Sequence, residues 1–327
     1  MSRLRKLGFL TIGLFDEADP AAGHETTLRM IELGERLGFD SAWVRHRHLQ
    51  FGISSPIAVL AAASQRTRRI ELGTAVIPLG WENPLRLAED LATVDILSGG
   101  RLNPGVSVGQ PMHYDHVKHA LYPHTADLED FGYERVRRLL DFVRGEPASD
   151  FEGTEGFEVF SRRVQPHSPG LIKRMWYGGG SLRSARWAGE QGMNFLTSSV
   201  VKAEESEDFA EIQLSHIRAF RAAHPDADFL IHPECGCSTS VMEYVASGDV
   251  PSEGVHMLST GGMLKYAEEH RGKGHGRRLM DWAMRVFQES GITRMEVKVV
   301  DGNPAVHLYE RYGFRIKSHI MLYRSPE

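Results

Sequence analysis

Histidine and cysteine, side chains that often ligate metals or carry redox chemistry, gather at three places along the chain. Histidines alternate with arginines in RHRH at residues 45–48, and four histidines follow in PMHYDHVKHALYPH at residues 111–124. Both cysteines of the chain, Cys235 and Cys237, stand in HPECGC, which begins at His232. Imidazole and thiolate groups at such short spacings are typical of zinc sites, so metal binding is the first chemistry to consider.

A complete metal site is not predicted at the second and third places. In PMHYDHVKHALYPH a three-residue spacing aligns His113 with later histidines, but Tyr122-Pro123 breaks the periodicity and no acid completes a ligand set. We expect an active-site loop instead, with His113 in contact with substrate. In HPECGC no fourth zinc ligand is evident, so two inert thiols at the end of a strand are expected. We predict no metal site in the chain.

A glycine-rich turn offers a different chemistry, the binding of phosphate. In YGGGSLRSARWA, residues 177–188, the glycines follow a strand and lead into a helix. Glycine lets backbone N–H groups approach a phosphate closely, and the helix start supplies the positive end of a dipole. A plain tight turn is the alternative interpretation. The residues assigned to the phosphate are Gly178, Gly179, Gly180 and Ser181.

Alternating strands and helices must position these groups. From residue 8 to residue 223, short apolar runs alternate with amphipathic stretches, as in parallel strands joined by right-handed crossovers. Six such units, with no nucleotide fingerprint after the first strand, favour a TIM-like α/β barrel over an open doubly wound sheet. FLIHPE (229–234) and VHMLST (255–260) are the predicted seventh and eighth strands. The other predicted strands lie at 8–14, 41–44, 70–77, 102–109, 175–179 and 193–199, with helices at 24–38, 56–65, 84–97, 128–143 and 182–192 and a long helix through Ala223. The end of the chain is predicted as a helix (271–291), a strand (293–300), a helix (303–314) and a strand (315–324).

A series of motifs in order carries a resemblance to a known family. The motifs are FDSAWV (39–44), LGTAV (72–76), NPLRLAE (83–89), LSGGRL (97–102), GVSVG (105–109) and the glycine turn. On these motifs residues 1–225 resemble the luciferase-like flavin monooxygenases, which are barrels that bind FMN or the deazaflavin F420. The resemblance implies that the glycine turn holds the cofactor's phosphate. It also implies that Ala75 and Val76, joined by an often cis peptide, lie beneath the flavin ring.

The same resemblance singles out the residues after the second strand. Many family members carry Glu-His-His there, at a catalytic or substrate-contacting position, whereas here Val44 is followed by Arg-His-Arg-His. His46 and His48 keep the imidazoles and are the candidate catalytic residues, while the carboxylate is replaced. The basic residues favour an anionic ligand or the phosphate of a reduced flavin. A solvated basic loop is the alternative.

Residues 226–268 carry a second resemblance. HPECGC, MEYVASGDV and LSTGGMLKY are similar to a piece of quinolinate synthase, an iron–sulfur enzyme. The resemblance implies that His232 and Glu234 contact substrate, with Ser259 and Thr260 in the same pocket. The cluster of that family needs three cysteines from separate parts of the chain, and this chain has none outside HPECGC. We therefore expect no quinolinate synthase activity.

RGKGHG (271–276) and NPAVHLYERYGF (303–314) carry a third resemblance. They are similar to the second half of a GNAT acetyltransferase, in which the backbone amides of a glycine loop hold the CoA pyrophosphate at a helix start. The resemblance implies that Asn303 contacts CoA and that Tyr309 is a general acid. The first half of that fold, which carries the acceptor site, is missing. The loop residues assigned to acetyl-CoA are Arg271, Gly272, Gly274 and Gly276.

Composition restricts the partners. The 327 residues are 41% hydrophobic and 25% charged, as in ordinary globular proteins. A net charge of −5 gives no electrostatic reason to expect nucleic acid or a membrane as partner. The start MSRLRKLGFLTIGLF leads into an acidic stretch, so a buried strand is expected rather than a signal peptide. Two closely spaced cysteines favour a reducing cytoplasm.

The three resemblances predict a mosaic with parts at 1–225, 226–268 and 269–327, as in a recombinant, designed or generated chimera. The predicted function is that of a flavin-dependent monooxygenase or oxidoreductase acting on a small molecule, with FMN or F420 as cofactor and with activity impaired by the mosaic. One alternative is GNAT-type acetyl transfer or simple CoA binding, and another is a folded chimera without catalytic activity. A homodimer is left open.

Overall fold

The computed structural model describes residues 6–197, 201–206, 209–231, 255–260, 277, 280–281, 284, 294–298, 306–317 and 320–324. The chain forms two compact units, Met1–Gly261 and Gly262–Glu327. Among these described residues, none of the helices has the length and apolar character needed to cross a membrane. Each unit is considered by itself below.

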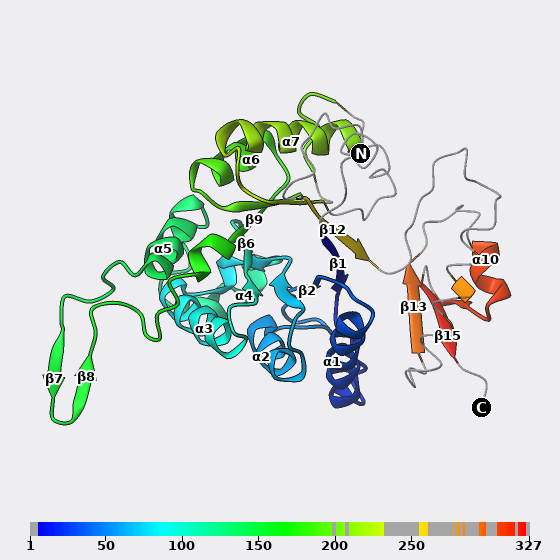
Figure 1. Cartoon of the computed structure of the whole chain (residues 1–327), viewed down its shortest axis with the longest axis horizontal. Helices are drawn as coiled ribbons and strands as arrows, with labels where there is room; N and C mark the ends of the chain where they lie inside the picture. The colour runs from blue at the N-terminus through cyan, green and yellow to red at the C-terminus, as the bar shows by residue number, and fades with distance from the viewer. Residues whose placement is uncertain are drawn as a thin grey trace. The chain divides into compact units, whose positions relative to one another are not determined.

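A closed parallel barrel forms the first unit (Figure 1). The strand order is β4-β6-β9-β10-β11-β12-β1-β2-β3-β5, and all pairs within it are parallel. Because β3 runs on into β4 and β5 into β6, the two ends of this order belong to the same two chain segments, and the sheet closes. The strands are β1 (Lys6–Thr11), β2 (Ser41–Val44), β3 (Glu71–Thr74), β4 (Ile77–Pro78), β5 (Leu102–Asn103), β6 (Gly105–Ser107), β9 (Trp176–Gly179), β10 (Asn194–Thr197), β11 (Phe229–Ile231) and β12 (Val255–Thr260).

The predicted α/β barrel is therefore confirmed, including its seventh and eighth strands. β11 pairs with β10 and β12, and β12 pairs with β1, so both strands from the stretch after residue 225 are part of the wall. Phe229 of β11 is fully buried, as expected of a barrel core residue.

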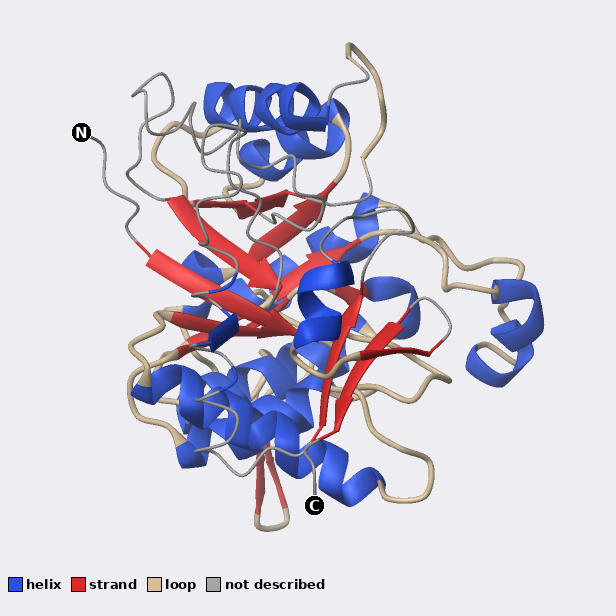
Figure 2. Cartoon of the chain, turned by 90° about the vertical axis from the view of Figure 1, so that its right-hand side faces the viewer, coloured by secondary structure: helices blue, strands red, loops and turns tan. Residues whose placement is uncertain are grey.

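Helices surround the barrel strands (Figure 2). Three of them begin with proline at the first turn, where a missing N–H costs nothing, and Asp19 and Asn83 cap two of these starts. The helices are α1 (Pro20–Arg36), α2 (Pro56–Arg66), α3 (Pro84–Leu97), α4 (Tyr114–Leu121), α5 (Tyr133–Arg144), α6 (Leu182–Glu190) and α7 (Phe209–Ala223), with short 3-10 turns η1 (Leu79–Trp81) and η2 (Leu171–Arg174).

Two tryptophans fill the barrel interior. Trp43 of β2 and Trp176 of β9 meet edge to face with ring centroids 5.4 Å apart, and both are buried. Gly73 of β3 makes room for them, because a Cβ there would lie 2.2 Å from the Trp43 ring. The interior is therefore a packed core that closes the barrel from within, and a ligand must bind at one of its ends.

A buried ion pair joins α3 to the segment before β9. Arg174, at the end of η2, donates to both carboxylate oxygens of Asp95 at 2.8 and 2.7 Å, and Ser168 donates to the same carboxylate at 2.6 Å. Asp95 is 1% exposed, so these partners replace the water that its carboxylate has lost.

The second unit contains a three-stranded antiparallel sheet in the order β13-β15-β14. Its elements are β13 (Arg294–Lys298), α10 (Val306–Arg311), β14 (Arg315–Lys317) and β15 (Ile320–Arg324). Residues 315–324 were expected as one strand and are two paired strands, so that prediction was wrong. One helix and one two-stranded ribbon were also not predicted. They are α4 and an exposed ribbon of β7 (Gly153–Glu155) and β8 (Glu158–Phe160) that extends from the barrel (Figure 1).

Candidate functional site

Most of the predicted site residues of the first unit follow the carboxyl ends of barrel strands. In a parallel barrel these ends meet on one face, which is where such folds carry their active sites. His46 and His48 follow β2, Ala75 and Val76 follow β3, and the glycine turn ends β9. The structure thus places residues from distant parts of the sequence around one barrel mouth.

His46 and His48 contact each other at this face. Their ring centroids lie 4.3 Å apart with the ring planes tilted by 52°, and His48 stacks on Trp81 of η1 at 4.0 Å. His46 is 3% exposed, and its Nε2 lies 2.9 Å from the carbonyl oxygen of Ser54. A carbonyl can only accept, so Nε2 carries the proton. The buried position of His46 is incompatible with a solvated basic loop at this residue.

Glu82 joins the pair, although the sequence analysis did not single it out. One of its carboxylate oxygens lies 3.9 Å from His46 Nε2. Burial, with a smaller contribution from Asp90, raises the pKa of Glu82 to about 7. Burial, followed by the repulsion of a protonated His48, lowers the pKa of His46 to about 4. At neutral pH the contact is therefore not an ion pair, because the imidazole of His46 is uncharged.

Ala75 and Val76 follow the carboxyl end of β3, next to the interior core. The peptide between them is cis, as the family resemblance implies. Both side chains pack against the cluster that contains Trp43 and Trp176. A Cβ on Gly178 would lie 2.7 Å from Val76 Cγ1, so glycine at this point of β9 leaves room for the Val76 side chain.

The glycine turn ends in a capped helix start. The Ser181 hydroxyl accepts from the backbone N–H of Ser184 at 3.1 Å. The backbone N–H of Leu182, in the same first turn, donates to the Glu204 carboxylate at 2.7 Å. Buried His216 of α7 brings its Nε2 to 3.6 Å from the same carboxylate. A carboxylate thus occupies the helix terminus at which the sequence predicted a phosphate, so the terminus does attract an anion.

The histidine-rich segment after β6 forms α4 rather than an irregular loop. His113 precedes α4 with a positive φ of 57° and is exposed, with its ring centroid 6.4 Å from that of His116. Tyr122 at the helix end donates to the carbonyl oxygen of Gly80 in η1 at 2.8 Å. This bond ties α4 to the turn that carries Trp81, while contact of His113 with substrate stays a prediction.

The remaining predicted residues lie elsewhere. Tyr309 is buried in the second unit, where it packs with Met280, Met284 and Phe314, and its role as general acid stays a prediction. Ser259 and Thr260 belong to β12. Outside the described residues lie His232, Glu234, Arg271, Gly272, Gly274, Gly276 and Asn303.

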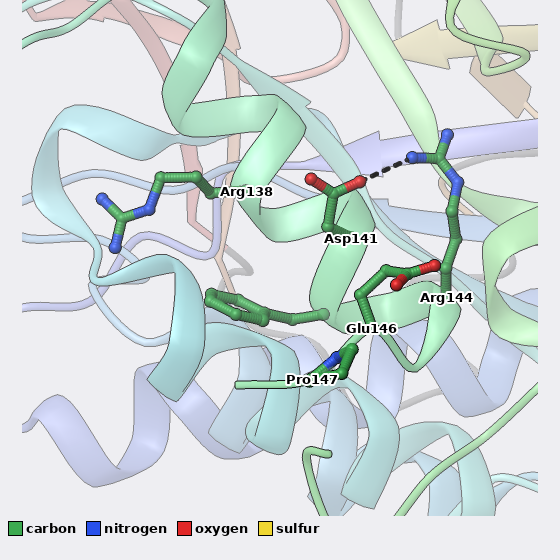
Figure 3. A pocket seen from close by; sticks show the side chains of 6 residues that line it. Arg138, Asp141, Arg144, Glu146 and Pro147 are labelled. Carbon is green, nitrogen blue, oxygen red and sulfur yellow. Dashed lines mark hydrogen bonds and ion pairs between the residues drawn. The ribbon is translucent and has the colours of Figure 1, made fainter. Parts of the chain in front are cut away.

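A hollow of about 530 Å³ lies beside the C-terminal end of α5 (Figure 3). Tyr133 at the start of α5 approaches Ser184 of the first turn of α6, whereas Arg144 at its end donates to Gln191 beyond the last turn of α6. The hollow therefore lies at the opposite end of the barrel from the site residues. Its lining residues are Arg138, Asp141, Phe142, Arg144, Glu146 and Pro147.

Known proteins match parts of the chain. A 4-hydroxyprotoasukamycin monooxygenase of Streptomyces nodosus subsp. asukaensis is 37% identical over 153 residues, which are 45% of this chain and 39% of the relative. A quinolinate synthase of Mycobacterium sp. (strain KMS) is 41% identical over 75 residues, 23% of this chain and 22% of the relative. The chain thus spans well under half the length of each of these relatives.

A solved structure shares the fold of most of the chain. The oxygenating constituent of 3,6-diketocamphane monooxygenase from Pseudomonas putida, in complex with FMN, has a TM-score of 0.53 at 14% identity. The match covers 89% of this chain and 90% of that one.

Two family profiles match the chain, as expected of a mosaic. The GNAT acetyltransferase profile matches residues 263–314, and the predicted set of three resemblances is confirmed. The luciferase-like monooxygenase profile matches residues 6–282, most of the chain and well beyond residue 225. The chain therefore belongs to the luciferase-like monooxygenase family.

Proposed function

We propose that this chain uses a reduced flavin, FMN or F420, to oxygenate or reduce a small molecule at the carboxyl face of its barrel. The observation that carries the proposal is the start of α6, where a glycine turn leads to a backbone N–H that already binds a carboxylate. The FMN complex of a protein with the same fold supports it.

The residues at the turn fit a phosphate group. A phosphate oxygen in place of the Glu204 carboxylate would accept from Leu182 N at the same point. Gly178 and Gly179 keep the turn free of side chains, and the Ser181 hydroxyl is held at the helix start. When bound, the flavin supplies the electrons for the reaction. The chain's own residues hold its phosphate, and the Trp43–Trp176 core closes the barrel below the site.

The two histidines are placed to receive the substrate. The bond from His46 to Ser54 fixes the tautomer, so the lone pair of Nδ1 is available to a ligand. Stacking on Trp81 holds the ring of His48. We assign both rings to binding and orienting the substrate beside the flavin.

Glu204→Ala tests the phosphate position, with the neighbouring exposed Glu205→Ala as matched control. Removing the competing carboxylate should tighten FMN binding about two- to fivefold, the value of one charge at a helix terminus. Riboflavin, which lacks the phosphate, should bind equally to both variants. Quenching of flavin fluorescence measures each affinity, with F420 titrated in parallel.

Absence of quenching by both FMN and F420 would refute the flavin proposal. An equal gain for riboflavin and FMN would show that Glu204 acts on something other than the phosphate. If the flavin binds but substrate turnover is low, the activity is impaired as the mosaic predicts.

Acetyl-CoA binding by the second unit is a second candidate, favoured by the GNAT match over residues 263–314. We expect acetyl-CoA to raise the melting temperature and Gly274→Val to remove that shift. A shift that survives Gly274→Val, or none at all, would rule out this candidate.

A further inference from the structure

We propose that His46, His48 and Glu82 bind a divalent transition-metal ion at the carboxyl face of the barrel. Each of the three offers a nitrogen or oxygen atom within 4.8 Å of those of the other two. This inference rests on the proposed function in one respect, since the ion would be held by the two imidazoles that we assign to orienting the substrate, whereas the glycine turn is not involved.

His46 has the geometry of a metal ligand supported by its surroundings. Its side chain is fully buried, and Nε2–H donates to the Ser54 carbonyl oxygen at 2.9 Å. Metal-ligating histidines usually donate their second ring N–H to a carbonyl or carboxylate in this way. Nδ1 is buried and has no hydrogen-bond partner among the described residues. A buried polar atom of this kind calls for a ligand, and a metal ion would satisfy its lone pair.

His48 provides a second ring nitrogen that is available to a metal ion. Its Nε2 is buried and likewise lacks a partner within the described part of the chain. The ring is nearly parallel to Trp81, with 14° between the planes, so it is oriented before any ion arrives.

Glu82 completes the donor set with a partly buried carboxylate. Two imidazoles and one carboxylate suit zinc, ferrous iron, cobalt or nickel rather than calcium or magnesium, which prefer oxygen ligands. Metal–nitrogen bonds of about 2.0–2.1 Å would require the three groups to move together by roughly an ångström. Three protein ligands leave at least one position open for water or substrate.

The decisive experiment is titration of the flavin-free full-length protein with Co²⁺, followed by its visible absorption and by calorimetry. We expect one equivalent with the spectrum of nitrogen and oxygen ligation. Glu82→Gln, which hardly changes the shape of the side chain, and His48→Ala should each lower the Co²⁺ affinity at least about tenfold. Even removal of a group that only hydrogen-bonds to a metal ligand costs about that much. Circular dichroism checks that both variants fold.

Two control variants separate this site from other metal-binding groups. His113→Ala with His116→Ala removes an exposed histidine pair, and Cys235→Ser with Cys237→Ser removes the thiols; both should leave the Co²⁺ affinity unchanged. Loss of binding in either control, a sulfur-ligation spectrum, or unchanged affinity in folded Glu82→Gln would overturn the proposal. FMN quenching, measured separately on each variant, should be unaffected by Glu82→Gln, so failure of the flavin proposal would be recognised on its own.

Discussion

The imidazole of His46 shows how burial sets the chemistry of a side chain. With its pKa lowered to about 4 by desolvation, it presents a lone pair at neutral pH instead of a positive charge. The arginines on either side in the sequence suggested an anion site, yet the buried histidine is uncharged. His46 and His48 were identified from sequence because they stand where many members of the resembling family carry Glu-His-His. Glu82 was not identified from sequence, because it comes near the two histidines only when separate strands of the barrel pair.

The buried carboxylate of Asp95 allows a prediction about the stability of the protein. Arg174→Met leaves a carboxylate that is 1% exposed without its cation, and we expect a loss of about 3–5 kcal/mol in the free energy of unfolding. Urea denaturation measures the loss. Arg137→Met is the control, because the ion pair between Arg137 and Glu134 is exposed. Its loss should change the free energy of unfolding by less than about 0.5 kcal/mol.

The double variant Asp95→Asn with Arg174→Met refines this test. With the buried charge removed, part of the lost stability should return, since no ion is left without a partner. A double variant less stable than Arg174→Met alone would contradict this account.

One carboxylate joins the end of α1 to the start of β3. Glu35 accepts from the backbone N–H groups of Arg68, Arg69 and Ile70 at 3.0, 2.6 and 2.7 Å. Burial opposes ionisation of Glu35, but these three donors outweigh it, so the pKa lies below its ordinary value of 4.5. The ionised carboxylate therefore fixes the loop that aligns the third strand.

Glu35→Gln should lower the free energy of unfolding at neutral pH by about 1–3 kcal/mol, as expected for hydrogen bonds to a charged group. Because the folded pKa is depressed, the stabilisation is complete above about pH 4.5 and is lost as the pH falls through the folded pKa. The difference between the native chain and Glu35→Gln should shrink in acid. Glu32→Gln on the same helix is the control, and a difference independent of pH would refute the mechanism.

Local signals explain which elements were predictable. α3 begins and ends where expected, because Asn83 and Pro84 form a cap and first turn that can be recognised from sequence alone. α4 was missed because it is short, polar and preceded by a residue in the left-handed conformation, with no capping side chain. The β7–β8 ribbon is rich in glycine and acids and exposes its apolar residues, so no hydrophobic alternation marked it.

The two compact units imply separate stability. A chain ending at Gly261 contains every described barrel strand, and we expect it to melt cooperatively and to bind FMN as the full chain does. Circular dichroism and flavin quenching of both chains make the comparison. A truncated chain that loses either property would show that the barrel depends on the second unit.

Barrel topology followed from the regular alternation of strands and helices, whereas the detailed site did not. The order of elements limits a parallel sheet to few arrangements. The approach of Glu204 to the α6 terminus and of Glu82 to the histidines depends on side-chain contacts between distant segments. Such contacts leave no periodicity in the sequence.

Closure of the barrel by β12 has a consequence for synthesis on the ribosome. β1 is made before β12, with which one of its edges pairs, and β12 ends at Thr260. Until that strand emerges, the nascent chain carries an open strand edge of the kind that recruits other chains. We therefore expect the open edge of β1 to need protection until β12 has been made.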